Sequence, residues 1–246
     1  MDYLKSQIFE PFTQVTCGFC LKLFDRFTPP YYQNMSYSSG SGISKISSDS
    51  SDFFKELDIA PEQLAELEHI HSNKIVLVKK PGFNGQADAM ITNLTGIALG
   101  IYSSECYPVF LYDPRNECIG GIRAGRRGIT LEIVALTIET MQNKFGTDPA
   151  ELLVWIGPGI SAQKKQPVPA AANEPHPLLD LKLAILKQLF DSGVKSENVE
   201  ILKESAFINN SSLYCYRPDG NLAGRYLGII MLRDEDEYLC KSEADK

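Results

Sequence analysis

The feature that most constrains the fold is the stretch Ala98–Gly128, in which three short apolar runs follow one another closely. The runs are rich in Ile, Leu, Val, Phe and Tyr, and they are separated by Cys106 and by the turn Asp113–Asn116. Short apolar runs bounded by turn residues are typical of buried strands. The stretch therefore predicts three successive buried strands around which the rest of the chain is organised.

The candidate functional residues lie where these strands end. Cys106 stands at the end of the first strand. A cluster of arginines lies at the end of the third, namely Arg123, Arg126 and Arg127. Gly125 and Gly128 stand beside them, and an uncrowded glycine backbone lets a small molecule come close. A thiol near several guanidinium groups predicts a site for an anionic or electrophilic compound.

The rest of the chain predicts an alternation of strands and helices. Further strands are predicted at residues 74–80, 87–92, 151–156, 199–202, 213–216 and 226–232. Helices are predicted at residues 51–57, 61–67, 130–145 and 178–190. The expected organisation is one α/β (α+β) domain over residues 1–246. Residues 36–51 contain nine Ser and two Gly, which predicts a mobile loop, and the acidic tail after Arg233 is expected to fray.

Composition and charge exclude several classes of function. A net charge of −7 and a pI near 5.1 argue against binding to nucleic acid or to an anionic membrane surface. No apolar run approaches the roughly 18 residues that a membrane span needs. The start, MDYLKSQIFEPF, lacks the basic and apolar regions of a signal peptide, so the expected location is cytoplasmic. The six cysteines are then expected to be reduced thiols.

Nine motifs occur in the order TCGF, PPYYQNMS, EHIHSNKIVLV, QADAMITN, GIALGIYSSECYPVFLYD, IGGIRAGRRG, WIGPGIS, LDLKLAILKQL and YCYRPDGNLAGR. Taken together, they give nearly the whole chain a resemblance to the bacterial laccase-domain proteins, also called multicopper polyphenol oxidase-like proteins and read as purine nucleoside phosphorylases. The resemblance implies a mixed two-sheet sandwich covered by helices, in α/β/β/α layers.

The resemblance also implies a zinc site with one ligand replaced. The family holds zinc with the His of a Q-V-H-G motif, the Cys of an A-D-C motif and the His that opens H-A-G-W-R-G. The matching residues here are His71, Cys106 and Arg123. A guanidinium stays protonated and has no lone pair to donate, so Arg123 cannot be a ligand. His69, at the family's Gln, is a candidate replacement, because alternate residues of an extended segment share a face. Zinc is expected ahead of copper, with binding weakened or absent.

Three functions remain open. The resemblance implies an enzyme that cleaves adenosine or inosine with phosphate, and in some members deaminates adenosine. Its catalytic residues here would be His71, Cys106 and Arg127, and its substrate or anion ligands Asn34, Asp88, Arg123, Arg126 and Arg217. The alternatives are a non-catalytic relative that binds an anionic small molecule or a partner protein, and a thiol hydrolase with His71 activating Cys106. The chain has three His, too few for the copper centres of a true multicopper laccase.

Overall fold

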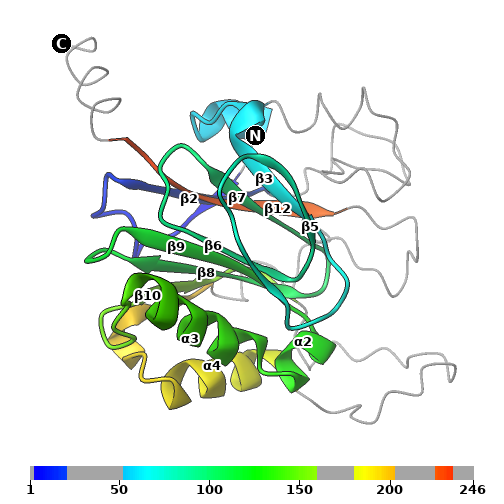
Figure 1. Cartoon of the computed structure of the whole chain (residues 1–246), viewed down its shortest axis with the longest axis vertical. Coiled ribbons are helices and arrows are strands. Elements are labelled where there is room, and N and C mark those ends of the chain that lie inside the picture. The colour runs from blue at the N-terminus through cyan, green and yellow to red at the C-terminus, as the bar shows by residue number, and fades with distance from the viewer. Residues whose placement is uncertain (1–2, 21–51, 160–179, 203–224, 235–246) are drawn as a thin grey trace, which may run out of the picture.

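Two six-stranded sheets form the centre of the molecule in the computed structural model, which describes residues 3–20, 52–159, 180–202 and 225–234 (Figure 1). The first sheet has the order β1 (Tyr3–Lys5), β2 (Val15–Cys20), β12 (Tyr226–Leu232), β7 (Ala98–Ser103), β3 (Leu64–Glu68) and β5 (Gly82–Gln86). The second has the order β11 (Val199–Ile201), β10 (Leu153–Ile156), β8 (Tyr107–Asp113), β9 (Cys118–Ala124), β6 (Ala89–Thr92) and β4 (Ile75–Leu77). Both sheets contain parallel and antiparallel pairs, so both are mixed.

Helices cover the outer faces of the two sheets, which gives the expected α/β/β/α layers (Figure 1). The second sheet is covered by α2 (Arg126–Thr130), α3 (Ile133–Phe145) and α4 (Leu181–Asp191). A short helix at residues 52–56, cyan in Figure 1, lies over the first sheet. The Leu57 side chain just after this helix packs so closely on β2 that a Cβ at Gly18 would lie 2.7 Å from it.

Two apolar cores hold the layers together. Between the sheets, the rings of Phe110 and Trp155 stack with their centroids 5.8 Å apart. Between the second sheet and its helices, Ile138, Met141 and Leu189 are fully buried. The second sheet is thus covered on both faces, and every residue of β8 and β9 is buried. This double burial explains why these strands read as nearly continuous apolar runs in the sequence.

Most of the predicted elements are confirmed. The stretch Ala98–Gly128 does contain three buried strands, β7, β8 and β9. The strand predicted at residues 74–80 is limited to β4. The helix predicted at residues 61–67 is wrong, because a 3-10 turn at Pro61–Gln63 leads directly into β3, which lies between β7 and β5. The loop 36–51, the strand 213–216 and the tail beyond residue 234 lie outside the described residues.

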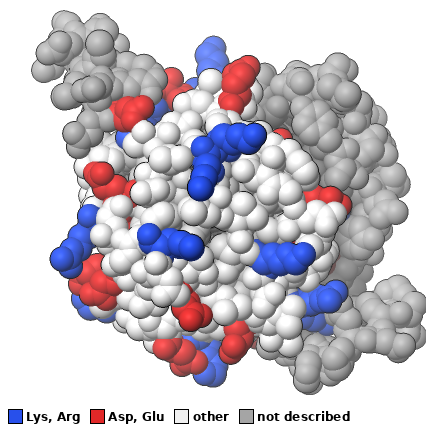
Figure 2. All heavy atoms as spheres, viewed as in Figure 1, with Lys and Arg blue, Asp and Glu red and all other residues white. Residues whose placement is uncertain are grey.

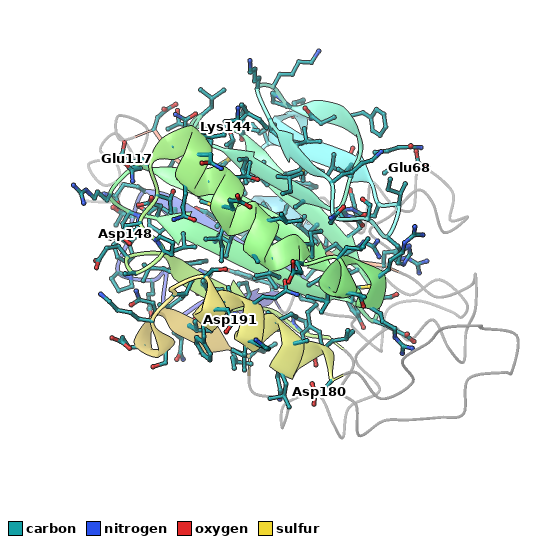
Figure 3. The ribbon with its side chains drawn as sticks, turned by 60° about the horizontal axis from the view of Figure 1, so that its bottom comes forward. Glu68, Glu117, Lys144, Asp148, Asp180 and Asp191 are labelled. Carbon is teal, nitrogen blue, oxygen red and sulfur yellow. The ribbon has the colours of Figure 1, made fainter. Side chains whose placement is uncertain are left out.

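The path of the chain between the sheets positions the site described below. Strands β3, β5 and β7 run parallel to one another in the first sheet, and after each of them the chain passes to the second sheet. The three crossovers, at residues 69–74, 87–88 and 104–106, therefore leave the first sheet at the same end. In Figure 3, Glu68 at the end of β3 lies on the opposite side of the molecule from Glu117, in the turn between β8 and β9.

The described part of the chain carries no helix long and apolar enough to cross a membrane. Figure 2 shows one face of the molecule, on which the described Lys, Arg, Asp and Glu side chains are scattered among uncharged residues and form no broad area of a single sign.

Candidate functional site

The candidate site lies where the three crossovers meet the end of β9. The first crossover supplies His69 and His71, the second supplies Asp88, and the third supplies Cys106. Arg123 comes from β9, where Gly121, two residues earlier, faces Ile101 of the first sheet. Alternate residues of a strand share a face, so the Arg123 side chain points between the two sheets, toward the crossovers.

The register of β6 and β9 places Asp88 beside Arg123. Ala89 pairs with Ile122, and the backbone N–H of Arg123 donates to the Asp88 carbonyl at 2.8 Å. Their side chains form a buried ion pair, 7% and 1% exposed. Arg123 Nε donates to Asp88 Oδ1 at 2.9 Å, and Arg123 Nη2 donates to the same oxygen. Asp88, expected to bind substrate, therefore serves as the counterion of Arg123.

Ser72 completes the surroundings of the Asp88 carboxylate. Its backbone N–H and its hydroxyl both donate to Asp88 Oδ2, the hydroxyl at 2.8 Å. Burial by itself would raise the pKa of Asp88, but the Arg123 guanidinium and the hydrogen bonds from Ser72 outweigh burial and lower it. Asp88 is therefore ionised at neutral pH. Sequence reasoning missed Ser72, because a lone serine in a crossover carries no signal until the fold places Asp88 against it.

The third nitrogen of the Arg123 guanidinium contacts both residues that the family resemblance assigns to zinc. Arg123 Nη1 lies 3.1 Å from His71 Nε2 and 3.4 Å from Cys106 Sγ. A guanidinium only donates, so His71 Nε2 must accept and its ring proton lies on Nδ1. His71 is exposed and adopts a left-handed backbone with φ of 56°. This backbone conformation ends the extended path and turns the imidazole toward Arg123.

His69 does not share a strand face with His71 as expected, because β3 ends at Glu68 and His71 has left-handed φ. The His69 ring is bound to backbone on both sides. Its Nδ1 lies 3.3 Å from the Ala87 carbonyl, and its Nε2 accepts the Tyr102 N–H at 3.3 Å. Burial, assisted by the Arg123 charge, lowers the pKa of His69 to about 4. A neutral His69 does not form an ion pair with Asp88, although its ring lies 4.0 Å away. A metal role for His69 would require one of its backbone hydrogen bonds to break.

Cys106 is a half-buried thiol held against Arg123. Burial raises the pKa of Cys106, and the guanidinium of Arg123 compensates for this only in part. A Cβ at Gly125 would lie 2.8 Å from Cys106 Sγ. The expected open backbone at Gly125 is therefore wrong, since the space beside this glycine is filled by the thiol. The same correction applies to Gly128, where a Cβ would lie 3.0 Å from the Ser72 carbonyl.

The remaining candidate residues lie either on the next helix or outside the described residues. Arg126 and Arg127 begin α2, Arg126 half-buried and Arg127 exposed. Asn34 and Arg217 lie outside the described residues. Within the part of the chain that the structure describes, no three side chains of the His, Cys, Asp and Glu types are grouped so as to hold a metal ion. The structure thus unites His69, His71, Asp88, Cys106 and Arg123, with two further arginines on the following helix.

Comparison with known proteins connects this geometry to a family. Residues 17–233 match the family described as multi-copper polyphenol oxidoreductase laccase. A purine nucleoside phosphorylase of Corynebacterium glutamicum is 27% identical over an alignment of 197 positions, and the match covers 73% of this chain and 78% of that protein. A purine nucleoside phosphorylase of Deinococcus radiodurans is 28% identical over an alignment of 190 positions, and the match covers 72% of this chain and 73% of that protein.

Solved structures show the same fold. YfiH from Bacillus licheniformis, described as a hypothetical protein, has a TM-score of 0.80 at 20% identity, over 91% of this chain and 95% of its own. YlmD from Geobacillus stearothermophilus has a TM-score of 0.79 at 22% identity, over 91% of this chain and 94% of its own. Because the family match spans most of its length, this chain belongs to the multi-copper polyphenol oxidoreductase laccase family.

Proposed function

We propose that the protein is a purine nucleoside phosphorylase, which cleaves adenosine or inosine with phosphate as the attacking group. Relatives named for this activity cover about three quarters of the chain, which supports an enzyme of this kind. The observation that carries the proposal is the convergence of an imidazole, a thiol and an ion-paired guanidinium at one end of the sandwich, next to a helix that begins with two further arginines.

In phosphorolysis, a phosphate oxygen forms a bond to C1′ of the ribose, and the bond from C1′ to the purine nitrogen breaks. The bonding electrons leave with the purine, which then takes up a proton. The attacking anion needs to be held and neutralised, and forked arginine hydrogen bonds suit this task. Arg126 and Arg127 are assigned this role, because the charge of Arg123 is already balanced by Asp88. Asn34 and Arg217 complete the proposed substrate contacts.

His71 is proposed to donate a hydrogen bond from its neutral ring to the departing purine, which takes its proton from solvent. Its exposed ring carries the proton on Nδ1, since Nε2 accepts from Arg123. Such a hydrogen bond stabilises the negative charge that develops on the purine as the bond to C1′ breaks. Arg123 acts as a positioning residue in this scheme, because it fixes the His71 tautomer and contacts Cys106. Cys106 is proposed to line the site, where its raised pKa keeps it a neutral thiol.

The test is base release from adenosine and from inosine, measured by chromatography with and without phosphate. Phosphate-dependent base release is the expected result, and an assay for ammonia on the same samples detects adenosine deamination. Arg127→Ala should lower kcat/KM for phosphate by about 10- to 100-fold without a change in Tm, because Arg127 is exposed. Lys187→Ala removes an exposed cation from α4 and is the matched control. No phosphate-dependent base release from either nucleoside would refute the proposal.

One observation favours a second candidate, a non-catalytic protein that binds an anionic small molecule. Arg123 stands at a position that the family fills with a metal-binding His. The charge of Arg123 is balanced by its ion pair with Asp88. Calorimetry with inosine and phosphate separates the two candidates, since a binder shows saturable heat without base release. The thiol hydrolase gains no support, because such an enzyme needs a lowered thiol pKa and that of Cys106 is raised.

A further inference from the structure

The Arg123 guanidinium fills the space that a metal ion would need. A zinc ion bound to His71 Nε2 and Cys106 Sγ would lie about 2.0–2.3 Å from each atom, between them. Arg123 Nη1 already contacts both atoms, at 3.1 Å from the nitrogen and 3.4 Å from the sulfur, and it uses the Nε2 lone pair that zinc would need. A metal cannot share that space with a protonated nitrogen. The residues present at this site therefore do not fit a zinc ion.

The guanidinium is fixed in this position by contacts at its other atoms. Nε and Nη2 of Arg123 donate to one oxygen of Asp88, and the second oxygen of Asp88 is held by Ser72. The backbone N–H of Arg123 donates to the backbone of the same Asp88. A guanidinium is planar and rigid, so fixing two of its nitrogens also fixes the third. Nη1 cannot move away from His71 and Cys106 unless the buried ion pair separates.

The packing of Gly125 against Cys106 agrees with this placement. A Cβ at Gly125 would lie 2.8 Å from Cys106 Sγ and 3.8 Å from Arg123 Nη1. The absence of a side chain at Gly125 lets the sulfur come within 3.4 Å of Nη1. The charges of Arg123 and Asp88 balance each other, so the cluster needs no further cation.

We infer that Arg123 replaces the metal ion of this site by a built-in cation, so that His71 and Cys106 are organised around a guanidinium and the site works without metal. The inference goes beyond the proposed phosphorylase activity and does not depend on it, because its first readout is metal binding. The side chain at position 123 then determines whether the site binds a metal ion.

The deciding experiment compares zinc and cobalt binding by the full chain and by Arg123→His. Both proteins are dialysed against a chelator, titrated with Zn²⁺ by calorimetry, and desalted for metal analysis. The imidazole in Arg123→His would join His71 and Cys106 as a third ligand, and Asp88 would accept its second N–H. We expect Arg123→His to retain one zinc per chain and to bind it at least about 100-fold more tightly than the wild type. Co²⁺ should then show the visible absorption of a thiolate ligand.

Two controls separate this result from unspecific binding. Arg127→His introduces the same imidazole four residues further on, outside the cluster, and should gain no zinc affinity. Cys106→Ser in the Arg123→His background should remove the gain and the cobalt absorption. One zinc per chain in the dialysed wild type, lost in Cys106→Ser alone, would overturn the inference even if Arg123→His fails to fold. If the chain is a phosphorylase, chelator treatment should leave the wild-type rate unchanged, and a loss restored by zinc would also overturn it.

Discussion

Replacing Asp88 by Asn tests the buried ion pair from which the arrangement of the site follows. The carboxylate accepts two hydrogen bonds from Arg123 on one oxygen and two from Ser72 on the other. An amide has one oxygen and one NH₂ group. Whichever way the new amide turns, its NH₂ group faces either the donors of Arg123 or those of Ser72, and the guanidinium loses its counterion.

The expected loss of stability follows from the burial of the pair. The side chains of Asp88 and Arg123 are 1% and 7% exposed, so the values measured for surface ion pairs do not apply. Removing one partner of a buried pair costs about 3–5 kcal/mol, because the other charge stays buried without compensation. For a chain of this size, about 2–4 °C of Tm is lost per kcal/mol, so Asp88→Asn should lower Tm by about 6–20 °C.

The double variant Asp88→Asn, Arg123→Met is the control for charge. Its amide oxygen can face Ser72 while the NH₂ group faces an apolar side chain, so no charge is left buried. It should be more stable than Asp88→Asn by about 2 kcal/mol, although it removes more hydrogen bonds. Urea unfolding is followed by the fluorescence of Trp155, the single tryptophan of the chain, which is fully buried. A cost below about 1 kcal/mol for Asp88→Asn, or a double variant no more stable than the single one, would refute the reasoning.

Three further predictions concern stability and reactivity. Gly125→Ala should destabilise the protein by about 1–3 kcal/mol in urea unfolding, because the new methyl group would lie 2.8 Å from Cys106 Sγ; a gain in stability would contradict this packing. Asp180→Ala should cost about 1 kcal/mol, since Asp180 caps α4 by accepting from two backbone N–H groups; an unchanged urea midpoint would show that the cap contributes nothing. Iodoacetamide should modify half-buried Cys106 before the three buried cysteines of the described chain, and mass spectrometry of peptides that finds Cys118 modified first would disagree with the burial found here.

The sequence was most informative where burial alone decides the structure. The apolar runs of Ala98–Gly128 are buried on both faces, so their strand character does not depend on any one neighbour. The segment at residues 61–67 is different. Its Pro61 and Glu62 are good helix-start residues, but they form one 3-10 turn, and Leu64–Glu68 becomes a strand because β7 and β5 lie on either side of it. A preference for helix was overridden by partners that come later in the chain.

The proximity of three site residues was predicted, but the hydrogen bonds and ion pairs that connect them to the rest of the site were not. Cys106, His71 and Arg123 were expected to lie together, and the structure places them in contact. The pairing of Arg123 with Asp88 depends on the register between β6 and β9, across 35 residues of sequence, which no local pattern reveals. Asp88 alone reads as an ordinary turn residue, and Gly125 alone reads as an open backbone. Both acquire their roles from side chains that other segments of the chain bring to them.

The three crossovers that leave β3, β5 and β7 at one end also link the two layers mechanically. A ligand bound beside His71 and Cys106 would touch segments that connect the two sheets, so its binding energy would resist their separation. Amide protons at the ends of β3, β7 and β9 should then exchange more slowly together when a ligand is present, although these strands lie in different layers. A small molecule bound at this end would therefore stabilise the packing of the two sheets against each other.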